Sequence, residues 1–142
     1  MGNFPAVIAC CAAIVLAGSA AADPKPMPDS ARVYIIWPQD GQVIQGGKFW
    51  VRMGLVEAGV APAGTDKPFT GHHHLLLDTD LPPLDQEIPS DKTHLHFGRG
   101  QTEARLDLPP GKHTLQLLFA DAYHIPHQPP LYSSKITITV VP

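Results

Sequence analysis

The amino-acid sequence predicts an all-β domain, an immunoglobulin-like β-sandwich of about seven strands. Sixteen prolines and twelve glycines in 142 residues keep interrupting any helical period. Between them lie short segments in which apolar and polar residues alternate, such as 48–56, with Phe49, Val51 and Met53 on one face. Short alternating segments separated by turn residues are typical of β-sandwiches.

The strands are expected, in chain order, at residues 33–37, 48–56, 72–78, about 94–97, 102–108, 113–120 and 135–141. Residues 79–93, which contain several prolines, are expected to form a crossing without regular structure. Two segments narrow the sandwich to the immunoglobulin-like type. Residues 106–117, with Pro109-Pro110-Gly111 at the centre, resemble the approach to the penultimate strand of such domains, and residues 37–41 resemble their first strand and turn.

The first 22 residues are predicted to be a secretory signal peptide. Residues 4–17 are mostly apolar, and Ala20-Ala21-Ala22 before Asp23 forms an A-x-A cleavage site. The apolar part is too short to span a bilayer stably, which favours cleavage and export to the periplasm or the medium. Residues 23–31 are then expected to be a proline-rich linker, and residues 32–142 the sandwich domain.

Composition excludes several classes of function. Both cysteines, Cys10 and Cys11, lie in the predicted signal peptide, so the mature chain offers no thiolate to a metal or a substrate. The net charge of −3 argues against nucleic acid as a partner, because nucleic-acid binding requires a basic face. No later apolar stretch is long enough for a transmembrane segment in the mature chain.

Histidine is the most informative residue type in this chain. Eight are present, and seven of them fall in three short runs: His72-His73-His74, His94-Leu95-His96 and the segment 121–127. In an immunoglobulin-like sandwich these runs gather at one end, whereas His113 belongs at the other end. Because strand side chains alternate, His72 and His74 share a face and His73 takes the opposite one.

Several neutral imidazoles at one point would form a site for a divalent transition metal, copper(II) or zinc. No organic cofactor is indicated. The candidate ligands are His72, His74, His94, His96, His124 and His127. The residues expected to support them are Asp121, Asp78, Glu103 and Gln101. Such a site would serve metal storage, delivery or sensing in the periplasm.

Other interpretations remain open at this stage. A His-x-His pair on a strand is more often structural than metal-binding, and the two histidines of the 121–127 segment are equally compatible with loop packing. The domain would then be a non-catalytic interaction module, or an accessory subunit whose partner is another cell-envelope protein. A hydrolytic metalloenzyme is a third reading. However, the sequence lacks G-x-S-x-G, H-E-x-x-H and a reactive cysteine, so no enzymatic activity is predicted.

Four motifs resemble one known family. They are Gly71-His72-His73-His74-Leu75-Leu76-Leu77-Asp78, the run from His94 to Glu103, the run from Pro110 to Leu117, and the run from Asp121 to Pro130. Together they cover roughly residues 50–141, and they resemble a family of small exported bacterial proteins known only as domain of unknown function 4399. The resemblance implies an exported β-domain with the same histidine-rich motifs. It implies no activity, metal or partner.

Overall fold

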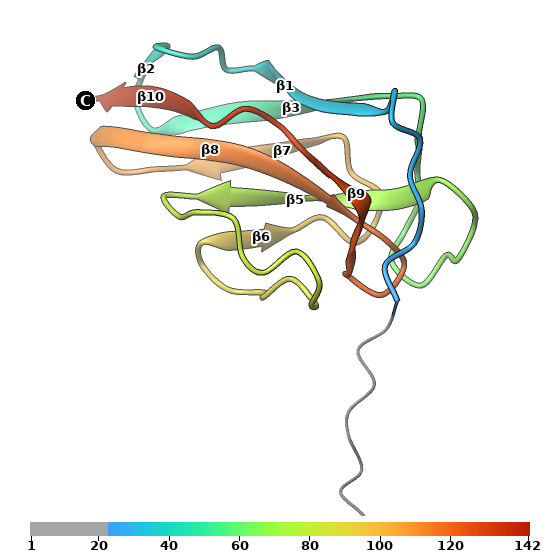
Figure 1. Cartoon of the computed structure of the whole chain (residues 1–142). Coiled ribbons are helices and arrows are strands. Elements are labelled where there is room, and N and C mark those ends of the chain that lie inside the picture. The colour runs from blue at the N-terminus through green and yellow to red at the C-terminus, as the bar shows by residue number, and fades with distance from the viewer. Residues whose placement is uncertain (1–22) are drawn as a thin grey trace, which may run out of the picture.

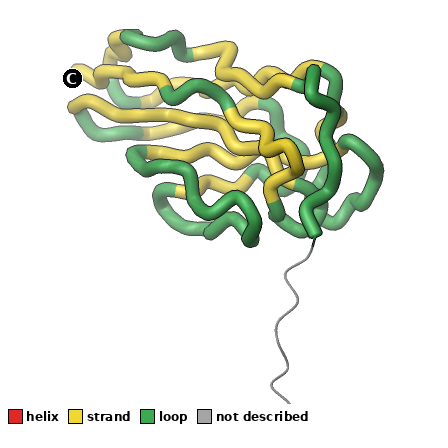
Figure 2. Tube along the Cα trace, viewed as in Figure 1, coloured by secondary structure: helices red, strands yellow, loops and turns green. Residues whose placement is uncertain are grey.

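The computed structural model describes residues 23–142, which form ten strands and no helix (Figures 1 and 2). The predicted signal peptide lies outside the described residues. The strands are β1 (Arg32–Trp37), β2 (Val43–Gln45), β3 (Lys48–Val56), β4 (Gly59–Val60), β5 (Thr70–Leu77), β6 (His94–His96), β7 (Glu103–Asp107), β8 (Gly111–Ala120), β9 (Pro126–Tyr132) and β10 (Ile136–Val141). The described part of the chain contains no helix long and apolar enough to cross a membrane.

The strands form two sheets, and the predicted β-sandwich is confirmed. One sheet has the order β1-β3-β7, and the other has the order β2-β10-β8-β5-β4, with β6 added on β5 and β9 added on β8 (Figure 1). The first two strands of the chain lie at the edges of different sheets. Strand β1 pairs antiparallel with β3, whereas β2 pairs parallel with β10 in the opposite sheet. This arrangement of sequential strands over two sheets is immunoglobulin-like.

The sandwich core lies between the two sheets. Alternating residues of β3 (Phe49, Val51, Met53) face alternating residues of β5 and β8, among them Leu75 and Phe119. A second, smaller cluster lies on the outer face of the larger sheet. There Leu76, Leu118 and Ala120 are covered by Ile88, Leu81 and Leu84 from the long 79–93 loop. The larger sheet therefore has side chains packed against both of its faces, so a histidine on either face can be buried.

The structure adds pairings and strands that the sequence-based strand list does not contain. Strand β6 pairs with β5, at the His74–His96 and Leu76–His94 positions, and has no partner in the sheet that contains β7. Residues 126–132, expected to be loop, form β9 and pair with β8. Short strands such as β4 raise the total from about seven to ten, because two- or three-residue pairings leave almost no periodic signal in a sequence.

Residues 23–31, expected to be a linker, pack into the domain. Met27 and Ala31 are buried members of the sandwich core. The backbone N–H of Met27 donates to the carbonyl of Gln128, and the N–H of Gln128 donates to the carbonyl of Lys25. Proline removes a backbone donor but leaves its carbonyl, so this proline-rich segment can still pair through its non-proline residues.

Candidate metal centre

Strand β5 carries three consecutive histidines, and its pleat divides them between two faces. His73 lies on the inner side with Leu75, and its ring meets Phe119 edge to face at a centroid distance of 5.2 Å. His72 and His74 lie on the outer side with Leu76. All three are buried although they are polar, because His73 lies between the two sheets and residues of the 79–93 loop pack over the outer face.

Strand pairing brings two further histidines to this outer face. His96 on β6 stands directly opposite His74 on β5. His72 is paired with Ala120, the last residue of β8, so the turn that follows β8 begins beside His72. That turn carries His124. Three segments far apart in the sequence thus contribute four imidazoles to one place, and we call His72, His74, His96 and His124 the histidine cluster.

The ring nitrogens of the cluster face one another. Nε2 of His96 lies 3.2 Å from Nε2 of His72 and 3.2 Å from Nε2 of His124. One ring nitrogen from each of His72, His74 and His96 lies within 4.8 Å of the others. Ring centroids within the cluster are separated by 4.7–5.9 Å. A set of imidazoles this close together could hold a metal ion.

Burial lowers the pKa of three of these imidazoles, those of His72, His74 and His96. For His72, burial first and then the neighbouring His124 and His96 lower the pKa to about 4. Burial lowers the pKa of His74 still more, again assisted by the neighbouring histidines. The pKa of His96 is also lowered, by burial and by His124. A neutral imidazole is the form that binds a metal, so no proton has to be displaced from these three rings at neutral pH.

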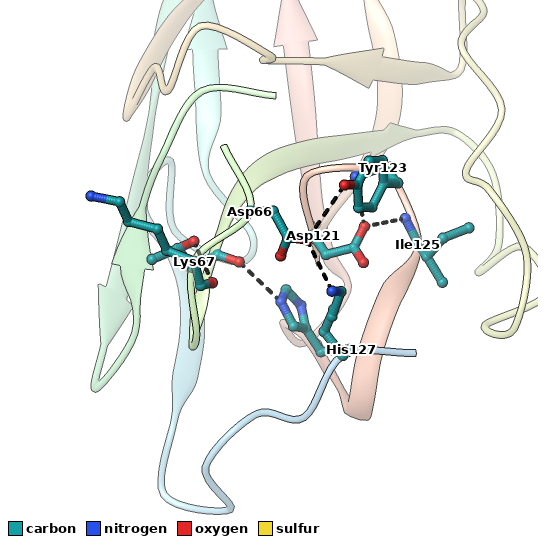
Figure 3. A network of polar contacts seen from close by, with 8 residues as sticks. Asp66, Lys67, Asp121, Tyr123, Ile125 and His127 are labelled. Atoms are coloured by element: carbon teal, nitrogen blue, oxygen red, sulfur yellow. Dashed lines mark hydrogen bonds and ion pairs between the residues drawn. The ribbon is translucent and has the colours of Figure 1, made fainter. Parts of the chain in front are cut away.

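The turn that presents His124 is fixed by a buried aspartate. Oδ1 of Asp121 accepts hydrogen bonds from the backbone N–H groups of Tyr123 (2.8 Å) and Ile125 (3.0 Å), as Figure 3 shows. His124 itself adopts a left-handed conformation with φ of 66°. Its carbonyl accepts a hydrogen bond from the N–H of Ile88, which joins the turn to the 79–93 loop. Asp121 therefore supports the site through the backbone of the turn.

Two predicted ligands lie outside the cluster. On β9, His127 stacks on Phe119 at a centroid distance of 5.8 Å, and its Nε2–H donates to the carbonyl of Thr70, 3.1 Å away (Figure 3). Pairing of β9 with β8 turns this ring toward the core. His94 is two residues before His96 on β6 and is paired with Leu76. Its Nδ1 lies 2.9 Å from Oδ1 of Asp91. His94 is the first residue of β6, and its contacts with Asp91 join it to the turn that precedes this strand.

Three predicted supporting residues also lie elsewhere. Asp78 follows the far end of β5, where Oδ2 is 2.7 Å from Nδ1 of His113. Glu103 is in the other sheet, 3.5 Å from Arg52. Gln101 accepts a hydrogen bond from the N–H of Arg99 within its own turn. Each was expected to complete or orient the site, but the strand ends and the sheet assignment separate them from the cluster.

His113 occupies the opposite end, as expected, and has a structural role. Burial lowers its pKa, but Asp78 at Nδ1 and the carbonyl of Pro109 at Nε2 raise it more, so the net pKa is raised. Both ring nitrogens have acceptors, which favours the charged imidazolium. This is the electrostatic opposite of the cluster, where burial and mutual repulsion favour neutral rings.

Sequence reasoning missed two residues that contact the cluster. Oε1 of Glu87 in the 79–93 loop lies 3.7 Å from Nδ1 of His124, on the side of the ring facing away from the cluster. The Gly98 backbone lies against the His96 ring, so a Cβ at this position would come within 2.4 Å of its Nε2. The glycine is visible in the sequence as part of Phe97-Gly98, but only the folded structure shows which ring requires it. Nothing in the sequence marks Glu87.

The fold and the cluster together define a class: an all-β, immunoglobulin-like domain with a histidine cluster on the outer face of its larger sheet. A family model described as "Domain of unknown function (DUF4399)" matches residues 51–141. The chain therefore belongs to the DUF4399 family, and the matched region includes every residue of the cluster. No curated protein and no solved structure is significantly similar to the chain.

Proposed function

We propose that this protein binds one divalent transition-metal ion, zinc(II) or copper(II), through His72, His74, His96 and His124. Export by a cleaved signal peptide would place this activity in the periplasm or the medium, where it would serve metal storage, delivery or sensing. The observation that carries the proposal is the pair of 3.2 Å separations that join Nε2 of His96 to Nε2 of His72 and of His124.

The chemistry of the donors fits a metal better than it fits a structural network. Nε2 of His96 contacts the Nε2 atoms of both His72 and His124, although a ring nitrogen carries either one N–H or one lone pair and can satisfy only one of them. Burying polar groups without partners is unfavourable, and four adjacent imidazoles have few ways of satisfying one another. A bound cation would convert this unfavourable arrangement into coordinate bonds.

The spacing is compatible with zinc and with copper(II). With metal–nitrogen bonds of about 2.0–2.1 Å, neighbouring ligand nitrogens are separated by about 3.3 Å in tetrahedral coordination and about 2.9 Å at right angles. The two observed separations of 3.2 Å lie between these values, and the donor nitrogens of His72, His74 and His96 spread over as much as 4.8 Å, so the ligands would close onto either ion. Thioether copper(I) sites and blue-copper sites need sulfur ligands, and Met27 and Met53 are both buried in the sandwich core.

Calorimetry on untagged residues 23–142 tests the proposal. We expect one equivalent of zinc or copper(II) to bind with sub-micromolar affinity, and this sub-micromolar binding to be lost in both His72→Ala and His124→Ala. His94→Ala and His127→Ala are the matched controls, because these rings lie outside the cluster, and they should bind normally. Weak binding that none of the four substitutions changes would refute the metal site.

A second candidate is a non-catalytic interaction module, or an accessory subunit of a cell-envelope complex. The observation favouring it is the outer face of the β1-β3-β7 sheet, where Tyr34 and Trp50 are about half exposed. Exposed aromatic side chains often anchor protein interfaces. Substitution of Trp50 by alanine should then abolish capture of an envelope partner while leaving metal binding unchanged. Under either candidate the role is binding, since no catalytic signature accompanies the histidines.

A further inference from the structure

The four imidazoles of the histidine cluster differ in their access to solvent. His72 and His74, the inner pair, are 0% and 1% exposed. His96 is exposed, and the side chain of His124 retains 29% of its accessible surface. We call these two the outer pair. An ion held by all four rings would have the β5 backbone behind it and the outer pair between it and solvent.

The outer pair is carried by short elements at the edge of the sheet. His96 ends the three-residue strand β6, and His124 is in a turn. The turn does not depend on the His124 side chain. Its backbone is held by Asp121, which accepts two N–H groups, and by Ile88, whose N–H donates to the His124 carbonyl. The His124 ring can therefore leave the cluster while the turn keeps its conformation.

A residue is also in position to receive a displaced His124 ring. The exposed carboxylate of Glu87 lies 3.7 Å from Nδ1 of this ring. While Nε2 binds a metal, a carboxylate near Nδ1 orients the ring and increases its basicity. Once Nε2 has left the metal, the same carboxylate can hold the ring away from the cluster.

Resting on the proposed function, we infer that metal enters and leaves this site at the outer pair by ligand substitution. A donor atom of an acceptor protein, an imidazole or a thiolate, forms a bond to the metal as the bond to His124 Nε2 breaks. His96 is replaced next, and the inner pair releases the ion last. Each step exchanges one coordinate bond for another without a redox change. This mechanism assigns the protein to metal delivery, with an acceptor that approaches the exposed edge of β6 and the 121–125 turn.

The test is the rate of zinc transfer from the loaded full mature chain to a colorimetric chelator, measured by stopped flow over a range of chelator concentrations. We expect the wild-type rate to increase with chelator concentration, because the chelator takes part in the substitution. His124→Ala keeps the His72, His74 and His96 donors and is loaded at a zinc concentration above its raised dissociation constant; its transfer should be at least about ten-fold faster, since the first ligand is already absent. His113→Ala, at the opposite end of the domain, is the control and should behave as wild type.

Glu87→Gln gives an independent readout that keeps all four ligands. It should weaken zinc affinity, because Glu87 no longer supports the bound His124 ring. It should nevertheless slow transfer several-fold, because the displaced ring loses its charged partner. A wild-type rate that is independent of chelator concentration, or a Glu87→Gln rate equal to wild type, would overturn the exchange mechanism while metal binding stands. Failure of the wild-type chain to take up one equivalent of zinc would overturn the proposed function itself.

Discussion

Substitution of Gly98 by alanine should displace one ligand of the cluster, His96, without changing the ligand residue itself. The new Cβ would lie 2.3 Å from Cε1 and 2.4 Å from Nε2 of His96, whereas ordinary contact begins at 3.4 Å. The His96 ring must therefore move by about 1 Å, which greatly exceeds the roughly 0.2 Å tolerance of a metal–ligand bond. The atoms in the way belong to the end of a side chain, so the ring can rotate outward and the fold should persist.

We expect this substitution to weaken zinc binding by about ten- to a hundred-fold, or about 1.4–2.7 kcal/mol, as measured by calorimetry. The thermal unfolding midpoint of the metal-free protein should change little. In the metal-free protein the pKa of His96, followed by NMR, should rise toward its ordinary value, because the ring leaves the burial that lowers it.

A double-mutant cycle provides the control. Once His96 is alanine, adding Gly98→Ala should have no further effect on zinc affinity, because the clash has no ring to displace. Wild-type affinity and stoichiometry in the single Gly98→Ala variant would show that His96 is not a ligand. Equal losses in both backgrounds would show that the glycine acts on the fold and not on the ring.

Two further predictions concern the metal-free fold. Burial lowers the pKa of His72 and of His73 to about 4, against about 6.5 in an unfolded chain. Their contribution to stability is therefore complete above about pH 6.5 and is lost as the pH falls toward 4. The loss is at most about 1.4 kcal/mol per pH unit for each histidine. Urea unfolding at pH 7.5, 6 and 5 measures the free energy of unfolding, and equal values at the three pH values would contradict the prediction. Secondly, both ring nitrogens of His73 are buried without partners, so His73→Leu should raise the free energy of unfolding by about 1 kcal/mol and leave zinc affinity unchanged. Destabilisation by this substitution, or loss of zinc binding, would be evidence for a role that its contacts do not reveal.

Much of the site could be predicted because strand geometry is simple. The two-residue period of a strand separates His73 from His72 and His74, and the structure has them on opposite faces of the sheet. The sandwich topology predicted that segments around 72, 96 and 124 would meet at one end. Those two rules placed residues correctly because neither depends on the details of a loop.

Register and loop conformation account for the residues that were misplaced. His127 is three residues after His124, but the 121–125 turn and the start of β9 rotate it onto Phe119. The 79–93 loop has no periodic pattern, so its packing over the outer face could not be anticipated, and Glu87 was missed with it. A sequence shows which residues share a strand face, whereas contacts made by an irregular loop depend on tertiary packing.

The N-terminal segment has a practical consequence for anyone who expresses this domain. A recombinant chain that starts at Arg32, where the first sheet begins, would lose Met27 and Ala31 from the core. It would also leave the backbone N–H and carbonyl of Gln128 unpaired along the outer side of β9. Open strand edges recruit other chains, so such a truncation invites aggregation. Insolubility of that shortened protein would say nothing against the stability of the sandwich itself.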